Sequence, residues 1–336
     1  MSQIAAAHEF RAAAPTQATA SAGERAFDDS LFSAVLVAAG MLAGVAVPGL
    51  AAMLSPLLLP SLFVIILTSL FPLRKVIGTS LFSFDLSTLA AVAWLQFVLP
   101  GLVLAISAIL TVPDEIVVFV LFTACCSTVF ASPTIADMVG LSRLTASRIM
   151  VLSTLVAPIS IAAFLGPFMG VFDLAALKVF AERVGIYLII PLGIVTILAM
   201  VEGPRVARVY DLAERGSQRI GMMALAIFAV ALMNGTPEKF AADPVLMLAM
   251  FAGVLLLNLG MALSSLFVFG MRLRRTARLI ALVSTMRNVG LGMALVAAFF
   301  GPDLACYVAL CQVPLMVLPM LFRLANGGRT EAQAAS

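Results

Sequence analysis

Charged residues are scarce in this sequence: 11% of its 336 residues are Asp, Glu, Lys or Arg, against about 25% in an average soluble domain. Apolar residues make up 62%, and the mean hydropathy is +1.14. The charges are too few to cover a water-facing surface, and the apolar residues are too many for one buried core. The composition excludes a soluble globular domain and predicts an all-α integral membrane protein.

Histidine is almost absent, and cysteine is confined to apolar runs. The single histidine, His8, lies in a polar tail, which excludes a buried catalytic triad and a zinc site with imidazole ligands. The four cysteines, two of them the adjacent pair Cys125 and Cys126, form no disulfide framework. A phosphate-binding loop and an H-E-x-x-H motif are also missing. We therefore expect neither an enzyme nor a resident metal or cofactor, and the partners expected are a lipid bilayer and a small solute, not a nucleic acid.

The apolar residues fall into ten runs between two polar tails, 1–30 and 326–336, and several connections between the runs are very short. Each run is long enough to be a candidate membrane-spanning helix, with boundaries good to a few residues. The runs are 31–48, 52–72, 87–111, 115–139, 144–171, 176–202, 217–235, 244–270, 276–299 and 303–325.

The basic residues predict the orientation of these spans. With ten spans both tails lie on one side, and 16 of the 20 Lys and Arg residues fall in the tails and the loops of that side. The opposite side carries only Lys178, Arg183 and Lys239, and Arg287 lies inside span 9. Because cytoplasmic loops are enriched in Lys and Arg, this asymmetry places both termini in the cytoplasm of a multi-pass inner-membrane protein.

A weak internal repeat divides the spans into two sets of five. A shift of 157 residues carries Ser127-Thr128 onto Ser284-Thr285, and it superimposes several spans of residues 31–171 on spans of 172–325. Five spans is an odd number, so the second set must enter the membrane from the other side. Inverted repeats of this kind are common in secondary transporters.

Two spans at equivalent places in the repeats contain polar, helix-breaking residues. In span 4, Ser127, Thr128 and Ser132 precede Pro133, which removes a backbone donor. In span 9, Ser284-Thr285 precedes Arg287-Asn288, and two glycines follow. Interrupted helices at membrane depth expose backbone groups that must line a cavity or be buried in protein. They are the strongest indication in the sequence of a transport site.

These segments resemble the bile acid:sodium symporter family. The stretch from Ala131-Ser132 to Pro158, with Ser153-Thr154 within it, resembles helices 4 and 5 of that family, and STMRNVGLGMAL resembles helix 9. The resemblance implies ten helices in two inverted five-helix repeats, with broken helices 4 and 9 crossing near the midplane. It also implies a panel domain of spans 1, 2, 6 and 7, a core domain of the other spans, and sodium-coupled import of organic anions such as bile acids and keto or hydroxy acids.

The chain departs from that family at its sodium ligands. Val283 and Arg287 replace a Glu and a Gln of span 9, and Pro133 replaces an Asn of span 4, whereas Ser132, Ser153, Thr154 and Asn288 remain. An arginine cannot lose its charge and can grip a carboxylate through two hydrogen bonds. We expect Arg287 to replace the bound cation in a transporter that does not need sodium, or else to pair structurally with Asp137 or with carbonyls exposed at the breaks.

The remaining candidates have weaker support. Asp137 is expected beside Arg287 or as a proton carrier, or alternatively in water at the cytoplasmic end of span 4. Gln312 is expected either in the same cavity or as an interhelical hydrogen bonder, and Trp94 and Gln96 in packing. The alternatives to an organic anion transporter are an arsenite-type efflux permease, for which Cys125 and Cys126 are candidates, and a channel. The sites expected are therefore Ser127, Thr128, Ser132, Pro133, Asp137, Ser153, Thr154, Ser284, Thr285, Arg287, Asn288 and Gln312.

Overall fold

The computed structural model describes residues 35–71, 85–170, 173–200, 204–270 and 274–325. These residues form helices and no strand, apart from one isolated antiparallel bridge between Thr128 and Arg287. The α-helices are Val35–Ala46, α2 (Pro48–Leu54), α3 (Leu58–Leu70), α5 (Leu86–Ala93), α6 (Leu99–Ile109), α7 (Asp114–Cys125), α8 (Ser132–Met138), α9 (Arg143–Met169), α10 (Leu174–Val184), α11 (Ile190–Met200), α12 (Pro204–Ala231), α13 (Thr236–Ala242), α14 (Pro244–Gly270), α15 (Arg274–Thr285) and α16 (Val289–Ala325). Short 3-10 or π-helical turns, η1 (Ser55–Leu57), η3 (Trp94–Val98) and η4 (Gly185–Ile189), join some of them without a loop.

Six stretches are long and apolar enough to cross a membrane: Pro48–Leu70, Leu86–Ile109, Arg143–Met169, Leu174–Met200, Arg219–Ala242 and Pro244–Gly270. Large apolar side chains are exposed on many of them, for example Met53, Ile109 and Phe267. A water-soluble protein rarely exposes so much apolar surface. The chain is therefore an all-α membrane protein, as its composition predicts.

Most helices fall where the apolar runs predict them, within a few residues, although α12 begins at Pro204, well before the run 217–235, and not all of the runs form one continuous helix. The run 115–139 is divided into α7 and α8, and the run 276–299 into α15 and the start of α16. α16 itself bends at Gly301, where φ is 60°, so that apolar helices Val289–Gly301 and Asp303–Leu315 lie on either side.

Local sequence explains several helix ends outside the apolar interior. Asp85 precedes α5 and accepts a 3.2 Å hydrogen bond from the Thr88 N–H. Hydrogen bonds from the Ser87 and Thr88 side chains lower the pKa of the Asp85 carboxyl to about 2. Ser142 accepts from the Thr145 N–H at the start of α9. These are the residue types that cap helix N-termini best.

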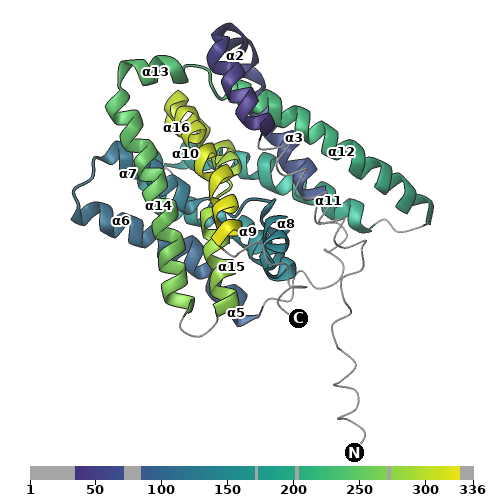
Figure 1. Cartoon of the computed structure of the whole chain (residues 1–336). Coiled ribbons are helices and arrows are strands. Elements are labelled where there is room, and N and C mark those ends of the chain that lie inside the picture. Colours follow the sequence, from purple (N-terminus) through teal and green to yellow (C-terminus); the bar gives the residue numbers. More distant parts are fainter. Residues whose placement is uncertain (1–34, 72–84, 171–172, 201–203, 271–273, 326–336) are drawn as a thin grey trace, which may run out of the picture.

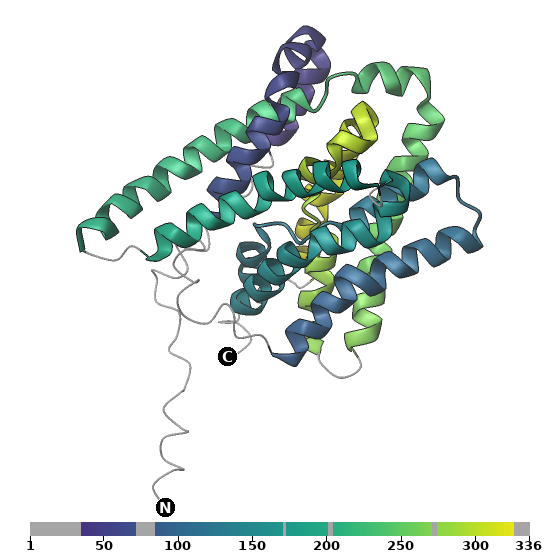
Figure 2. The same cartoon turned by 180° about the vertical axis from the view of Figure 1, so that it is seen from behind.

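The helices pack as two groups, which Figure 1 and Figure 2 show side by side. We call α2, α3 and α10–α12 the panel group, and α5–α9 with α14–α16 the core group. Helix Val35–Ala46 joins the panel group, because Gly40 and Gly44 let its backbone closely approach Ala229 of α12 and Met233 in the turn that follows α12. Among the described helices, the main contacts between the two groups are those of α16 with α3, α10 and η4.

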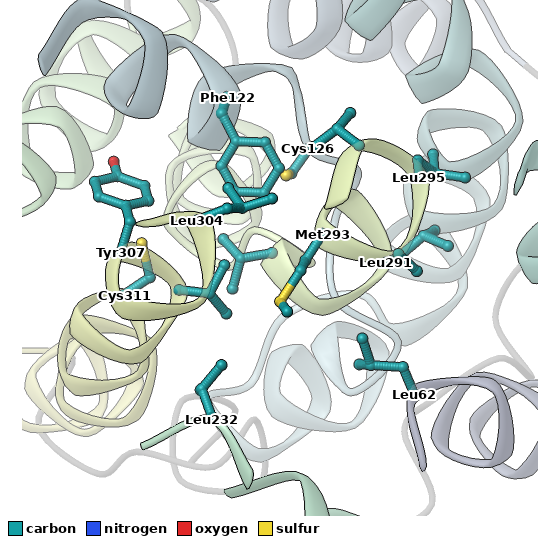
Figure 3. Packing of buried hydrophobic residues seen from close by; sticks show 14 of the residues in the cluster. Leu62, Phe122, Cys126, Leu232, Leu291, Met293, Leu295, Leu304, Tyr307 and Cys311 are labelled. Carbon is teal, nitrogen blue, oxygen red and sulfur yellow. The ribbon is translucent and has the colours of Figure 1, made fainter. Parts of the chain in front are cut away.

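A continuous apolar cluster fills the space around the first half of α16 (Figure 3). Leu291 and Met293 of α16 and Leu62 of α3 belong to this cluster, and Phe122 of α7 packs on the other side of α16. Tyr307, beyond the Gly301 bend, stacks on Phe119 with ring centroids 5.0 Å apart. The first half of α16, Val289–Gly301, therefore packs against both groups.

Candidate functional site at the crossing of two interrupted helices

The first interruption separates α7 from α8. α7 ends at Cys125, and the backbone of Cys126 is extended, with φ −61° and ψ 149°. Helical structure resumes at Ser132, with Pro133 in the first turn of α8, where its missing N–H would have no helical partner anyway. Pro133 therefore starts the second half-helix, which is the role predicted for it as a helix breaker.

The second interruption separates α15 from α16 and is shorter. Met286, Arg287 and Asn288 lie outside the helices, between Thr285 and Val289. The Asn288 side-chain oxygen accepts a 3.0 Å hydrogen bond from the Leu291 N–H. Asn288 thus caps α16 and stabilises the resumed helix.

The two interruptions cross each other and exchange backbone hydrogen bonds. The Val129 N–H donates to the Met286 carbonyl at 2.8 Å, and the Asn288 N–H donates to the Ser127 carbonyl at 2.7 Å. Backbone groups released by each break are therefore satisfied by the other. This pairing makes irregular backbone tolerable inside an apolar interior.

Arg287 fills the centre of the crossing and is 2% exposed. Its Nε donates to the Ser284 carbonyl at 3.0 Å, its Nη1 to the Cys126 carbonyl at 3.0 Å, and its Nη2 to the Leu95 carbonyl at 3.1 Å. Nη2 also lies 3.5 Å from the Met261 sulfur. A guanidinium has five N–H groups, so these contacts leave no free pair for a bidentate grip on a carboxylate in this conformation.

The Leu95 carbonyl is available because of a local irregularity in the third apolar run. In the π-turn Trp94–Val98 the Leu99 N–H bonds to the Trp94 carbonyl, and Pro100 has no N–H to donate. The carbonyls of Leu95 and Gln96 consequently lose their helical partners. Arg287 takes the first, and the Ser160 hydroxyl donates to the second at 2.5 Å.

Arg287 is the only charged side chain buried in the described part of the chain. No buried carboxylate accompanies it there, so its positive charge is balanced only by carbonyl dipoles, including those at the C-terminal ends of α7 and α15. In the same region, five buried polar atoms have no hydrogen-bond partner in the protein: Gln96 Oε1, Ser127 Oγ, Thr128 Oγ1, Ser132 Oγ and Asn288 Nδ2. The Gln96 oxygen can only accept, but the three hydroxyl groups and the Asn288 amide can donate. A buried cation beside these unused donors is suited to an anion.

Several predicted residues are satisfied by the protein itself. The Ser153 hydroxyl accepts from the Thr128 N–H at 3.2 Å, which ties α9 to the crossing. The hydroxyl of Thr154 donates to the Met150 carbonyl one turn earlier, and those of Ser284 and Thr285 likewise bond within α15. Gln312 donates to the Val308 carbonyl of its own helix.

The expectation that Asp137 lies beside Arg287 is wrong. Its side chain is 61% exposed and lies 3.9 Å from that of Arg143, at the end of α8. α8 is only seven residues long, so its last turn has already left the buried crossing. The structure has the alternative placement, in which the carboxylate is exposed at the end of span 4.

Gln96 and Leu95 were not among the predicted site residues. The Gln96 amide donates to the Cys126 carbonyl at 3.2 Å, which Arg287 also contacts, so Gln96 belongs to the crossing. In the sequence, the feature that indicates this role is an amide side chain, Gln96, in an apolar run four residues before Pro100. Trp94, by contrast, packs as predicted: its Nε1 donates to Ser265 and its ring meets Phe269 edge to face.

In the described residues, no group of three or more His, Cys, Asp or Glu side chains could hold a metal ion. Cys126 instead packs against Gly292, where a Cβ would lie 2.3 Å from its sulfur. Comparison with known proteins adds no family, since neither a protein-family model nor a curated protein matches the sequence.

Proposed function

We propose that this protein is a secondary active transporter that carries a small organic anion, of the bile acid or keto and hydroxy acid type, across an inner membrane without needing sodium. In this proposal the helices form ten spans in two inverted five-helix repeats of the bile acid symporter fold, with both termini in the cytoplasm. The interrupted helices α7/α8 and α15/α16 would be the crossing helices of that fold.

One observation carries the proposal: a fully buried guanidinium without a carboxylate partner, surrounded by unpartnered hydroxyl and amide groups. A charged side chain at the centre of a bilayer costs at least ~2.5 kcal/mol, and such residues usually mark a pathway or a site. The carbonyls around Arg287 offset part of this cost but leave the region positive. An organic anion would complete the charge balance.

The same geometry argues against a bound sodium ion at the crossing. A hard cation would need several oxygen ligands, and the carbonyls of Leu95, Cys126 and Ser284 already accept from Arg287. Val283 is buried and apolar, and it stands at the position where the bile acid:sodium symporter family has a carboxylate. In the proposed mechanism Arg287 supplies the fixed positive charge, and no sodium site is needed.

The packing of the two helix groups supports alternating access. Because the panel and core groups meet mainly through α16, they can move relative to each other with few contacts to break. The crossing lies directly before the first turn of α16. A rocking motion about this helix would expose the site to one side of the membrane and then to the other.

Uptake into proteoliposomes tests the proposal. We expect saturable uptake of one or more of cholate, pyruvate, lactate and 2-oxoisovalerate, at the same rate when choline replaces sodium. Liposomes without protein are the control for leakage, and arsenite and chloride fluxes measure the permease and channel alternatives. Strict dependence on sodium overturns the sodium-independent mechanism, and flux of arsenite or chloride alone overturns organic anion transport.

A further inference from the structure

A second arginine, Arg183, lies inside a long helical stretch of the panel group. The distribution of basic residues along the sequence predicts that Arg183 belongs to the outer side of the membrane. In the structure it is the tenth residue of α10, within the continuous helical stretch Leu174–Met200. At a rise of 1.5 Å per residue it lies roughly 14 Å along that helix. It is half-buried, where an arginine needs a reason to be.

The guanidinium of Arg183 is only weakly engaged. Its one hydrogen bond runs from Nη1 to the Ala294 carbonyl of α16 and is 3.4 Å long. Glu182, the acidic residue next to it, pairs with Lys178 on another side of α10. In the described part of the chain no carboxylate lies within salt-bridge distance of Arg183. Most of its five N–H groups are therefore free for an incoming acceptor.

Arg183 and the crossing share one face of α16. Gly290 and Ala294 are four residues apart, so they lie on the same face of the helix, about 6 Å apart along its axis. A Cβ on Gly290 would lie 3.1 Å from Leu62 of α3 and 3.7 Å from the Asn288 side-chain oxygen. This face of α16 therefore contacts α3 at Gly290 and α10 at Ala294. Asn288, whose amide nitrogen has no hydrogen-bond partner, lies next to its N-terminal end.

We propose that Arg183 binds the carboxylate of the transported anion at the junction of α10 and α16, with Asn288 Nδ2 as a second donor. This inference rests on the proposed function and names the group that does what Arg287 cannot do in this conformation. Arg287 makes the region positive but is engaged by carbonyls, whereas the planar fork of Arg183 matches a carboxylate. Tyr187, one turn further along the chain, packs edge to face on Phe63 of α3 and offers an apolar wall to the body of the anion.

This placement also connects binding to motion. An anion held by Arg183 replaces the long hydrogen bond to Ala294, and this bond is one of the contacts that α16 makes with the panel group. Occupation of the site therefore loosens one contact between the two groups and forms new ones through the anion. A carboxylate would stabilise the arrangement in which both groups contact it.

Anion binding to the full-length purified protein tests the inference. The probes are cholate, pyruvate, lactate and 2-oxoisovalerate, with binding measured by calorimetry and by the rise in unfolding temperature; the variants are Arg183→Ala, Arg183→Gln and Arg183→Lys. We expect Arg183→Ala and Arg183→Gln to weaken the tightest of these by about 10- to 100-fold, since a charge-assisted pair is replaced. Arg183→Lys keeps the charge without the fork and should recover part of the affinity.

Lys178→Ala is the matched control, because it removes a cation of the same helix that is exposed and paired with Glu182. It should leave binding unchanged. The methyl ester of the same acid, which lacks the charge, should bind wild type and Arg183→Gln equally, a result that a purely structural role for Arg183 does not give. If all three Arg183 variants bind the acid as tightly as wild type does, this inference alone is overturned. A wild type that binds none of the four acids overturns the proposed function as well.

Discussion

The two interruptions solve the same problem with opposite chemistry. The first leaves residues 126–131 outside the helices, contains no charge, and presents the carbonyls of Cys126 and Ser127. The second leaves only Met286, Arg287 and Asn288, and it presents mainly donors, a guanidinium and the Asn288 N–H, beside the Met286 carbonyl that accepts from the Val129 N–H. Most hydrogen bonds between the breaks therefore run from the second to the first, and neither break is satisfied without the other. The crossing is therefore a single unit built from two distant segments.

Removal of Arg287 should destabilise the crossing more than any other single change. Arg287→Ala leaves the carbonyls of Leu95 and Ser284 without their donor, leaves the Cys126 carbonyl with only the Gln96 amide, and opens a void in the core group. An uncompensated buried acceptor costs about 1–3 kcal/mol, so we expect a loss of roughly 3–5 kcal/mol, seen as a large drop in unfolding temperature in detergent.

Arg287→Lys should recover only part of that stability, because a single ammonium group cannot reach three carbonyls in the geometry of a planar fork. Arg143→Ala, which removes an exposed arginine, is the control and should have little effect. An Arg287→Ala variant as stable as wild type would show that the carbonyls are satisfied without the guanidinium.

Substitution of Gly292 by alanine should force the start of α16 away from the first break, because the added methyl group has no room there. Gly292→Ala places its Cβ 2.3 Å from Cys126 Sγ and 2.9 Å from the Phe122 ring, so one side must move. We expect a loss of about 1–3 kcal/mol in thermal unfolding. Gly290→Ala meets only the end of Leu62, at 3.1 Å, and should be milder.

The double variant Gly292→Ala/Cys126→Ala tests the cause of that loss. Removal of the sulfur relieves the closest contact, so the double variant should be more stable than the sum of the two single changes. Strict additivity would contradict a direct clash between the two segments.

The cap of α16 makes a smaller contribution. Asn288→Ala removes the oxygen that accepts from the Leu291 N–H and should cost about 1 kcal/mol. Asn288→Asp keeps that oxygen and adds a negative charge near Arg287, so it should retain the helix cap but bind anions more weakly. Thermal unfolding and anion binding measured on both variants separate capping from recognition.

Asp137 should matter least. It belongs to the segment of the first break but lies outside the crossing, exposed and loosely paired with Arg143. Asp137→Asn should change stability by less than about 0.5 kcal/mol and leave uptake unchanged at every pH tested. A pH-dependent change in uptake would instead assign it a part in proton movement.

The apolar runs and both breaks were predictable because their causes are local. Hydropathy defines the helices, and the structure interrupts them just before Pro133 and at Arg287-Asn288, whereas Gly290 and Gly292 lie within α16. Pairing with carbonyls exposed at the breaks was one of the two structural expectations for Arg287. The identity of those carbonyls was not predictable, since Leu95 depends on a π-turn that only its contacts reveal.

The depth of two charged side chains does not follow from the sequence. Asp137 lies two residues before the end of the predicted run 115–139, so both of its placements fit the pattern, and α8 ends after seven residues with Asp137 exposed. Arg183 belongs to the outer side of the membrane by its position among the basic residues, and in the structure it lies within the continuous α10–η4–α11 stretch. In both cases the depth of a charge depended on where a helix starts or stops, and composition determines this only to within a few residues.

The separation in sequence between Arg287 and its acceptors bears on how the chain is made. The guanidinium bonds to Cys126 and Leu95, which lie 161 and 192 residues earlier. A ribosome delivers these carbonyls to the membrane first, so when α15 emerges its charged residue meets partners that are already in place. A circularly permuted chain in which residues 172–325 are synthesised first would have to insert Arg287 without them, and it should integrate poorly even though it contains every residue of the folded protein.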